Sequence, residues 1–224
     1  MSDIVPWGRS YDEYLRMFGL GDAERRLRIL GCADGPASFN AEGTRRGTRI
    51  VSCDPLYQFD AAAIRERIDA TSLEVLEQTR ANADAFVWSS ISSVDELGAV
   101  RMAAMTQFLE DYDRGLAEQR YLPASLPSLP FADASFDLAL CSHFLFLYSE
   151  RLDVDFHAAS VLELCRVARQ VRIFPLLSLD GRRSPWIEPV RDRLVGTGHV
   201  VSLQTVDYEF QRGGNQMMEI RRGS

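Results

Sequence analysis

Short apolar runs alternate with longer stretches of helical spacing along this chain of 224 residues. Residues 27–31 (LRILG) and 49–53 (RIVSC) are β-prone, and the stretch 36–46 between them has the character of a helix that stops at a glycine. This order predicts a βαβ unit. Pro36 suits the first helical position, because its missing N–H would be unpaired there anyway, and Gly35 before it is the expected cap.

The second half repeats the alternation. Strand character returns near Tyr121 and becomes strong at 136–142 and 171–176, with a helical pattern over 154–170 between the last two. We therefore expect two more parallel crossovers.

The tail of the chain has two β-prone runs, 199–210 and 217–222, separated by a turn at 213–215. This spacing predicts a β-hairpin that closes the sheet. Seven strand-like runs alternating with helices predict an α/β fold: a doubly wound, Rossmann-like, mostly parallel seven-stranded sheet with an antiparallel C-terminal edge strand.

Residues 60–118 interrupt the alternation. The stretch has helical apolar spacing, is rich in helix formers and contains no convincing strand. We expect one domain over 1–224, with an N-terminal helical segment at 1–26 and a helical insertion at about 60–118. The insertion and residues 7–20 are candidates for a lid over a ligand, although helices packed for stability alone explain most of these residues.

Composition limits the classes of function. Hydrophobic residues make up 46% and charged residues 25% of the chain, as in ordinary globular proteins, and the net charge of -7 argues against broad nucleic-acid binding. No apolar run approaches the roughly 20 residues of a membrane span, and the first 20 residues do not resemble a secretory signal. We expect a cytoplasmic protein that does not bind membranes.

The four cysteines are scattered, with no C-x-x-C pair and no histidine at metal-ligand spacing. They are Cys32, Cys53, Cys141 and Cys165. This pattern predicts buried thiols in a reducing compartment and no metal site.

In doubly wound sheets, ligands bind beyond the carboxyl ends of the strands. The turn after the first predicted strand lies in ILGCADGPASF (29–39). A dinucleotide-binding fingerprint G-x-G-x-x-G would start at Gly31, but Ala33 and Pro36 occupy its other two glycine positions. Pro36 also removes a backbone donor that a pyrophosphate needs.

The turn and a later segment resemble the class I S-adenosylmethionine (SAM)-dependent methyltransferases, of the kind called methyltransferase type 11. That family has an acid, one residue and then G-x-G-x-G after its first strand, with a second acid about 20 residues later. Starting the glycine series at Ala33 places Asp54 at the family's distance, 19 residues beyond Gly35. The segment LPFADASFDLALCSHFLFLY (129–148) is similar to the family's LPF-x-D-x-SFD-x-V segment. The resemblance covers about 27–57 and 120–222.

The resemblance implies roles for individual residues. SAM would be the cofactor. Asp54 would bind the ribose, Pro55 and Leu56 would lie against the adenine, and Ser125, beside Leu126, stands where the family often has an acid that binds the adenine amino group. The other implied cofactor contacts are Ala33, Gly35, Cys141, Ser142 and His143, and Ser142 and His143 would lie near the sulfonium and its methyl group. A lone Asp after a strand is more often a turn cap, and only the spacing favours a function for Asp54.

The turn departs from the family pattern at three positions. Gly31 stands where the acid is expected, and Ala33 and Ala37 replace the first and third glycines. Asp34 is a candidate to bind the SAM ammonium in place of the missing acid. It is equally explained as an acid that serves the helix dipole.

Methyl transfer needs mainly proximity and orientation. His143 is the best-placed base for an oxygen or nitrogen acceptor, and a pocket-wall histidine without a proton role is the equal alternative. No Asp/Asn-Pro-Pro-Tyr motif follows the fourth strand-like run, which favours a small-molecule acceptor.

Further contacts are predicted from position. Arg9 is a candidate to pair with the SAM carboxylate and Tyr14 to line the site. Arg212 and Asn215, in the tail hairpin, are candidates to touch the acceptor, although a simple turn explains them as well. Phe144 is a candidate substrate contact but is more typical of a core position.

Two other functions compete. One is a protein with the SAM-binding fold that binds a ligand without catalysis, which the degraded glycine series favours. The other is a nucleotide-cofactor (NAD(P)) oxidoreductase, which the missing glycines and Pro36 disfavour.

Overall fold

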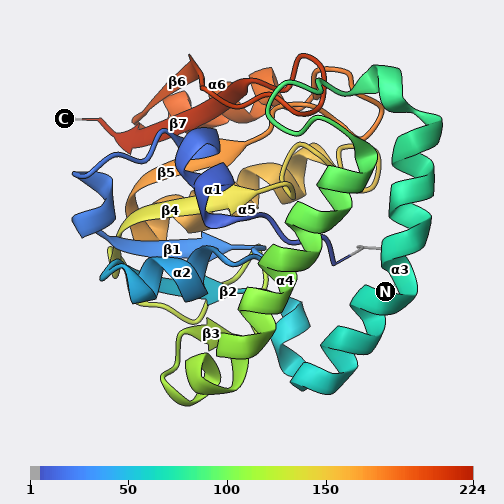
Figure 1. Cartoon of the computed structure of the whole chain (residues 1–224). Helices are drawn as coiled ribbons and strands as arrows, with labels where there is room; N and C mark the ends of the chain where they lie inside the picture. Colours follow the sequence, from blue (N-terminus) through green and yellow to red (C-terminus); the bar gives the residue numbers. More distant parts are fainter. Residues whose placement is uncertain (1–5, 224) are drawn as a thin grey trace.

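The computed structural model describes residues 6–223 and has a seven-stranded sheet at its centre, with helices on both faces (Figure 1). The strands are β1 (Arg28–Cys32), β2 (Arg49–Cys53), β3 (Tyr121–Leu122), β4 (Phe136–Ser142), β5 (Ala168–Phe174), β6 (His199–Thr205) and β7 (Gln216–Arg222). The helices are α1 (Tyr11–Phe18), α2 (Phe39–Arg45), α3 (Ala61–Ala81), α4 (Val94–Ala117), α5 (Val154–Val167) and α6 (Ile187–Gly196), with 3-10 turns η1 (Glu24–Arg26), η2 (Pro55–Gln58) and η3 (Ala83–Ala85).

The sheet order is β3-β2-β1-β4-β5-β7-β6, and all pairs are parallel except those that β7 makes. This confirms the predicted α/β, Rossmann-like fold class. The antiparallel strand itself lies one place inside the edge, between β5 and β6, because α6 first carries the chain past the β7 position. The predicted hairpin is present as β6 and β7, with a loop longer than the expected turn.

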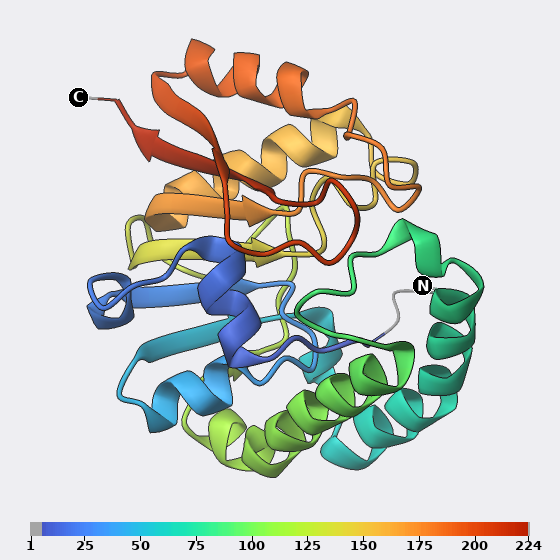
Figure 2. The ribbon, with the colours of Figure 1, turned by 45° about the horizontal axis from the view of Figure 1, so that its top comes forward.

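Two apolar cores sandwich the sheet (Figure 2). One core packs α5 and α6 on one face, and the other packs α1 and α2 on the opposite face. Alternate residues of β1 serve the two cores: Ile29 faces α1, whereas Leu30 faces α5. Burial on both faces explains why the central strands read as nearly continuous apolar runs.

Several predicted boundaries were wrong. Helix α2 begins at Phe39 after Ser38, not at Pro36, because Gly35 adopts a left-handed conformation (φ 53°) and residues 33–38 form an irregular turn. The α5 helix ends at Val167, and the next residues already belong to β5. Strand β6 stops at Thr205, and α6 has no counterpart among the predicted elements.

The chain between β2 and β3 forms η2, α3, η3 and α4. Helices α3 and α4 pack together beyond the carboxyl ends of the strands (Figure 2). Their connection meets the β6–β7 loop, where the Val87 N–H donates to the Phe210 carbonyl at 2.7 Å and Phe86 pairs with Gln211. Residues far apart in sequence therefore enclose the same end of the sheet.

All four cysteines are buried and free, as predicted. Within residues 6–223, no helix has the length and apolar character needed to cross a membrane. The first five residues of the predicted N-terminal segment lie outside the described residues.

Candidate functional site

The strand order reverses between β1 and β4. From β1 the chain proceeds to β2 and β3 on one side, whereas β4 begins the other half of the sheet. Such a switch point opens a crevice at the carboxyl ends of the strands. The residues just beyond both strands, Ala33 and His143, have positive φ angles of 58° and 53°. Strained non-glycine backbone of this kind gathers at functional sites.

The turn after β1 is held by three hydrogen bonds. The Ala33 N–H donates to the Cys53 carbonyl at 2.9 Å, and the Gly35 N–H donates to Asp54 Oδ2 at 2.9 Å. The Tyr57 hydroxyl donates to the Gly35 carbonyl at 2.8 Å. A Cβ on Gly35 would meet no atom within 4 Å, so the turn faces open space there.

Asp34 is a buried carboxylate surrounded by hydroxyls. Its side chain accepts from the Tyr14 hydroxyl at 2.8 Å and from the Ser52 hydroxyl at 2.7 Å. Burial raises the pKa of Asp34 to about 6, and the nearby charge of Asp54 adds to the rise, while the two hydroxyls lower it. Among residues 6–223 no cation forms an ion pair with this carboxylate, so its charge is uncompensated.

The Asp34 carboxyl fills the space that a side chain at position 31 would occupy. A Cβ built on Gly31 would lie 1.8 Å from Asp34 Oδ2 and 2.5 Å from the carboxyl carbon. Gly31 stands where the family pattern has its acid. The chain therefore brings a carboxylate to this place from three residues later, and the glycine makes room for it.

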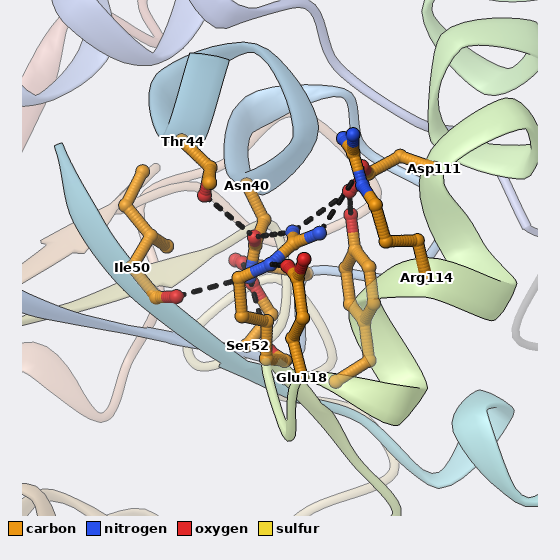
Figure 3. Close-up of polar contacts among 10 residues, drawn as sticks. Asn40, Thr44, Ile50, Ser52, Asp111, Arg114 and Glu118 are labelled. Atoms are coloured by element: carbon orange, nitrogen blue, oxygen red, sulfur yellow. Dashed lines mark hydrogen bonds and ion pairs between the residues drawn. The ribbon is translucent and has the colours of Figure 1, made fainter. Parts of the chain in front are cut away.

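A buried network of polar side chains holds Ser52 in place (Figure 3). Asn40, on α2, donates from Nδ2 to Ser52 Oγ at 3.1 Å and to the Arg120 carbonyl at 3.0 Å. The Arg120 guanidinium in turn donates to Asn40 Oδ1 at 2.7 Å and to Asp111 Oδ2 at 2.7 Å. The hydroxyl that binds Asp34 is thus fixed by helices α2 and α4.

Asp54 caps η2 and ties it to the turn. Its Oδ1 accepts from the Leu56 N–H at 2.8 Å, and its Oδ2 accepts from Gly35. The simple reading of Asp54 as a turn cap is therefore correct. A carboxylate has about four acceptor positions, so the two oxygens of this partly exposed side chain retain capacity for a ligand.

Two arginines lie near the Glu13 carboxylate, and one of them, Arg101, forms an ion pair with it. Arg101 is fully buried and forms an ion pair with Glu13, which also accepts from the Tyr208 hydroxyl at 2.8 Å. Burial raises the pKa of Glu13, but the Arg101 charge and hydrogen bond outweigh it and lower the pKa to about 2. Arg9 donates from Nη1 to the Trp7 carbonyl at 2.7 Å.

These guanidinium groups have unused donors. Arg9 Nε and Arg101 Nε and Nη2 are buried without a hydrogen-bond partner among the described residues. Burial and the charge of Arg101 lower the pKa of Arg9. Two cations thus face one anion, which leaves a positive charge unmatched.

His143 lies at the end of β4, next to Phe174, with a ring-centroid separation of 5.6 Å. Its Nδ1 is 2.9 Å from the Ser142 hydroxyl, which leaves Nε2 as the ring nitrogen available to a ligand. Burial, together with the charges of Arg9 and Arg101, holds the pKa of His143 well below its usual value. The imidazole is therefore neutral near pH 7, the form in which one ring nitrogen can accept a hydrogen bond.

A cavity of about 520 Å³ adjoins Arg9 and His143. It extends from the ends of β4 and β5 to the α3–α4 connection and the β6–β7 loop. Its size is usual for small-molecule pockets. Figure 2 shows how these segments face one another across that end of the sheet.

The structure does not bring every predicted residue to this cavity. Phe144 packs against Tyr148 and Phe156, at centroid distances of 6.2 Å each. The Arg212 guanidinium donates to the carbonyls of Asp84 and Phe86, at 3.2 Å each, and the Asn215 carbonyl accepts from Val206. The side chains of Phe144 and Arg212 are thus used in packing and in holding loops together, and Asn215 contributes its backbone carbonyl to the β6–β7 loop.

The remaining predicted residues lie around the turn or behind it. Pro55 is exposed and Leu56 partly buried on η2, and Ser125 is exposed in the loop after β3. Leu126 and Cys141 are buried in the core on the α5 face. Tyr14 is buried as well, and it acts on Asp34 rather than lining the cavity.

Sequence reasoning missed the partners of the buried charges. Ser52, Glu13 and Arg101 were not predicted as site residues, and the aromatic side chains of the cavity, such as Phe86 and Phe210, were also missed. The one usable signal was the capping box in which Ser10 binds Glu13, although it indicates only a helix start.

Comparisons with known proteins yield one relative in sequence. No protein-family model matches the chain. A protein of Methanocaldococcus jannaschii, named uncharacterized protein MJ0045, is 33% identical over 224 residues, which cover 99% of this chain and 98% of the relative. This similarity extends over both chains from end to end.

Solved structures give weaker likenesses. Magnesium protoporphyrin IX methyltransferase from Synechocystis with bound SAM has a TM-score of 0.47 at 11% identity, covering 88% of this chain and 70% of that one. A SAM-dependent methyltransferase from Thermotoga maritima, described as a possible histamine N-methyltransferase, has a TM-score of 0.46 at 11% identity, covering 96% and 89%. Values this low support no conclusion about activity.

Proposed function

We propose that this chain, which belongs to the family of the M. jannaschii protein MJ0045, is a SAM-dependent methyltransferase with a small-molecule acceptor. The observation that carries the proposal is a pair of charges of opposite sign, neither of which forms an ion pair within residues 6–223. Asp34 is a buried carboxylate with hydroxyl partners, and Arg9 is a half-buried guanidinium whose Nε is buried without a hydrogen-bond partner. Uncompensated buried charge is costly, so a ligand that supplies both counter-charges is favoured.

The amino-acid end of SAM has this pattern of charge. In the proposal Asp34 accepts from its ammonium and Arg9 donates to its carboxylate. Gly35 gives the close approach beside open space, and Asp54 accepts from the ribose hydroxyls. Pro55 and Ser125 are exposed and Leu56 is partly buried, and in the proposal these residues hold the adenine.

SAM, when bound, supplies an electrophilic methyl group on a sulfonium. The chain contributes orientation at the turn and a neutral base at His143 Nε2, which takes the proton of an oxygen or nitrogen acceptor. The Ser142 hydroxyl at Nδ1 orients the ring. Burial of all four cysteines as free thiols supports the proposal of a cytoplasmic location.

Of the two other functions, a specific observation favours one and two observations disfavour the other. Ala33 adopts the left-handed backbone that a glycine would adopt without strain, which favours a protein that binds SAM but has lost catalysis. An NAD(P) oxidoreductase is disfavoured because Pro36 removes a pyrophosphate donor and because Asp34 would face the phosphates with a negative charge.

Calorimetric titration with SAM, S-adenosylhomocysteine (SAH), 5′-methylthioadenosine and NAD tests the proposal. We expect SAM and SAH to bind and methylthioadenosine, which lacks the amino-acid end, to bind much more weakly. Arg9→Gln should bring the affinities for SAH and methylthioadenosine closer together. Binding of NAD alone would refute the proposal.

Asp54→Ala should weaken SAH binding by about 1–3 kcal/mol, the cost of leaving buried polar groups unpaired. Asp60→Ala is a matched control, because Asp60 also caps a helix, α3, but lies outside the turn. Transfer of a labelled methyl group into a metabolite extract then separates an enzyme from a binder, since a binder transfers none.

A further inference from the structure

The cavity next to His143 has walls of a distinct chemistry. This inference rests on the proposed function, because it concerns the acceptor of the same site. Five aromatic side chains from distant parts of the chain line the cavity beside His143: Trp7, Phe86, Phe174, Tyr208 and Phe210. Phe86 and Phe210 stack at 4.9 Å, and Phe174 and Tyr208 meet edge to face at 5.7 Å. Planar aromatic ligands gain from contacts of both kinds.

The cavity offers little charge to an acceptor. Among the described residues that line it, only Arg9 and Asp180 are fully charged. The proposed function assigns Arg9 to the cofactor. Asp180 lies at the outer rim, where it is 3.7 Å from the exposed Arg182 guanidinium. His143 is held neutral by burial, as shown by its lowered pKa.

The wall also carries uncharged polar side chains, among them the amides of Asn82 and Gln211. Asn82 uses its Nδ2 to donate to the Gln78 carbonyl at 2.8 Å, and Gln211 uses its Nε2 to donate to the Ser178 carbonyl at 3.4 Å. Both amides line the cavity and retain their oxygens, which accept hydrogen bonds. An acceptor with an O–H or N–H donor would satisfy them.

We infer that the cavity binds an uncharged, planar aromatic molecule that carries an O–H or N–H group. The aromatic walls favour a ligand with an aromatic ring. The lack of an available charged group among the described lining residues disfavours a charged ligand. The amide oxygens and His143 accept hydrogen bonds from the O–H or N–H group of the ligand. Ionic probes would lose their hydration without a partner, which is costly in a cavity of this kind.

The test measures binding of four probes of similar size to the protein saturated with SAH: phenol, cyclohexanol, benzoate and benzylamine. We expect phenol to bind about two- to tenfold more tightly than cyclohexanol, the range expected of one or two aromatic contacts. Benzoate and benzylamine should bind at least about tenfold more weakly than phenol. Equal binding of cyclohexanol, tightest binding of either ion, or binding of no probe would overturn the inference.

Variants of the lining residues test whether the preference for phenol over cyclohexanol arises in this cavity. Phe210→Leu and Phe86→Leu should each reduce the ratio of phenol to cyclohexanol affinity, and two positions keep the test decisive if one variant unfolds. Phe59→Leu is the matched control, because Phe59 is 51% exposed and does not line the cavity. Titration of SAH comes first, and its failure counts against the proposed function. The ratio of phenol to cyclohexanol affinity on the protein alone still tests the cavity, because neither probe can pair with a free Arg9.

Discussion

Two buried aspartates on the same face of the sheet have opposite surroundings. Asp111, on α4, is 5% exposed and Asp34, after β1, is 7% exposed. Asp111 accepts from Arg120 at 2.7 and 3.1 Å, from Arg114 and from the Tyr121 hydroxyl at 3.2 Å (Figure 3). Burial raises the pKa of Asp111, but Arg120 and Arg114 lower it by more, so the net shift of the pKa is downward. Asp34 has only hydroxyl partners, and its pKa rises to about 6.

Asp111 has cationic partners that tie parts of the fold together, whereas Asp34 has no cationic partner among the described residues. Arg120 links Asp111, Asn40 and Glu118, so its network joins α2, α4 and β3. The Asp34 carboxylate occupies the space above Gly31, and under the proposed function it binds the ammonium group of SAM. Equal burial therefore does not mean equal role, and the nature of the partners distinguishes the two.

Removal of Arg120 should have the largest effect. Arg120→Ala leaves Asp111 and Asn40 without their main partner, and breaking a buried ion pair costs about 3–5 kcal/mol. Urea unfolding should show a loss of this size in the free energy of unfolding. A loss below about 1 kcal/mol would mean that Asp111 is not held by this pair.

Asp34→Asn should change the free energy of unfolding in the opposite direction, toward greater stability. A carboxyl whose pKa rises from 3.8 to about 6 on folding stabilises the protein fully below pH 4, and this contribution is lost as the pH rises through 6. At pH 7 the uncharged variant should therefore be more stable than the parent, by up to about 3 kcal/mol. Unfolding free energies between pH 4 and 8 measure the difference, which should grow with pH.

The affinity for SAH shows whether the more stable Asp34→Asn variant has also lost a ligand-binding group. Asp34→Asn should also weaken SAH binding at pH 7 and remove the dependence of that binding on pH near 6. Increased stability with unchanged affinity would contradict the role proposed for Asp34.

Gly31→Ala tests the shared space above β1. Its methyl group would overlap the Asp34 carboxyl at 1.8 Å and displace it, at about 1–3 kcal/mol for overpacking. The double variant Gly31→Asp, Asp34→Ala should recover stability and part of the SAH affinity, because it returns a carboxyl to this space from position 31. Additive losses would show that the two positions are independent.

Arg114→Ala should have the smallest effect and serves as the control for Arg120. Its side chain is 58% exposed and contacts Asp111 from outside. Exposed ion pairs are worth about 0–1 kcal/mol, so the loss on urea unfolding should stay within that range. A loss equal to that of Arg120→Ala would remove the distinction between the buried and exposed partners.

Sequence patterns predicted the fold class and the order of the main elements. The β-prone runs, the helical spacing and the glycines gave strands β1, β2, β4, β5 and the final hairpin at nearly their observed places. Boundaries failed where local patterns compete, as at Pro36, which reads as a helix start but lies in the turn. The site was predicted less well, because Phe144 and Arg212 have the right position along the chain but point elsewhere.

By itself, the sequence determined the alternation that folds into a doubly wound sheet and the turn at its switch point, because periodicity and turn residues act over a few positions. Only the tertiary structure decided that the carboxyl of Asp34 fills the space of a side chain at Gly31. Tertiary packing also set Arg101 beside Glu13, 88 residues away, and brought Phe86 onto Phe210. Burial and charge depend on such long-range neighbours, and these neighbours give one aspartate arginine partners and give the other, within residues 6–223, hydroxyl partners and no ion pair.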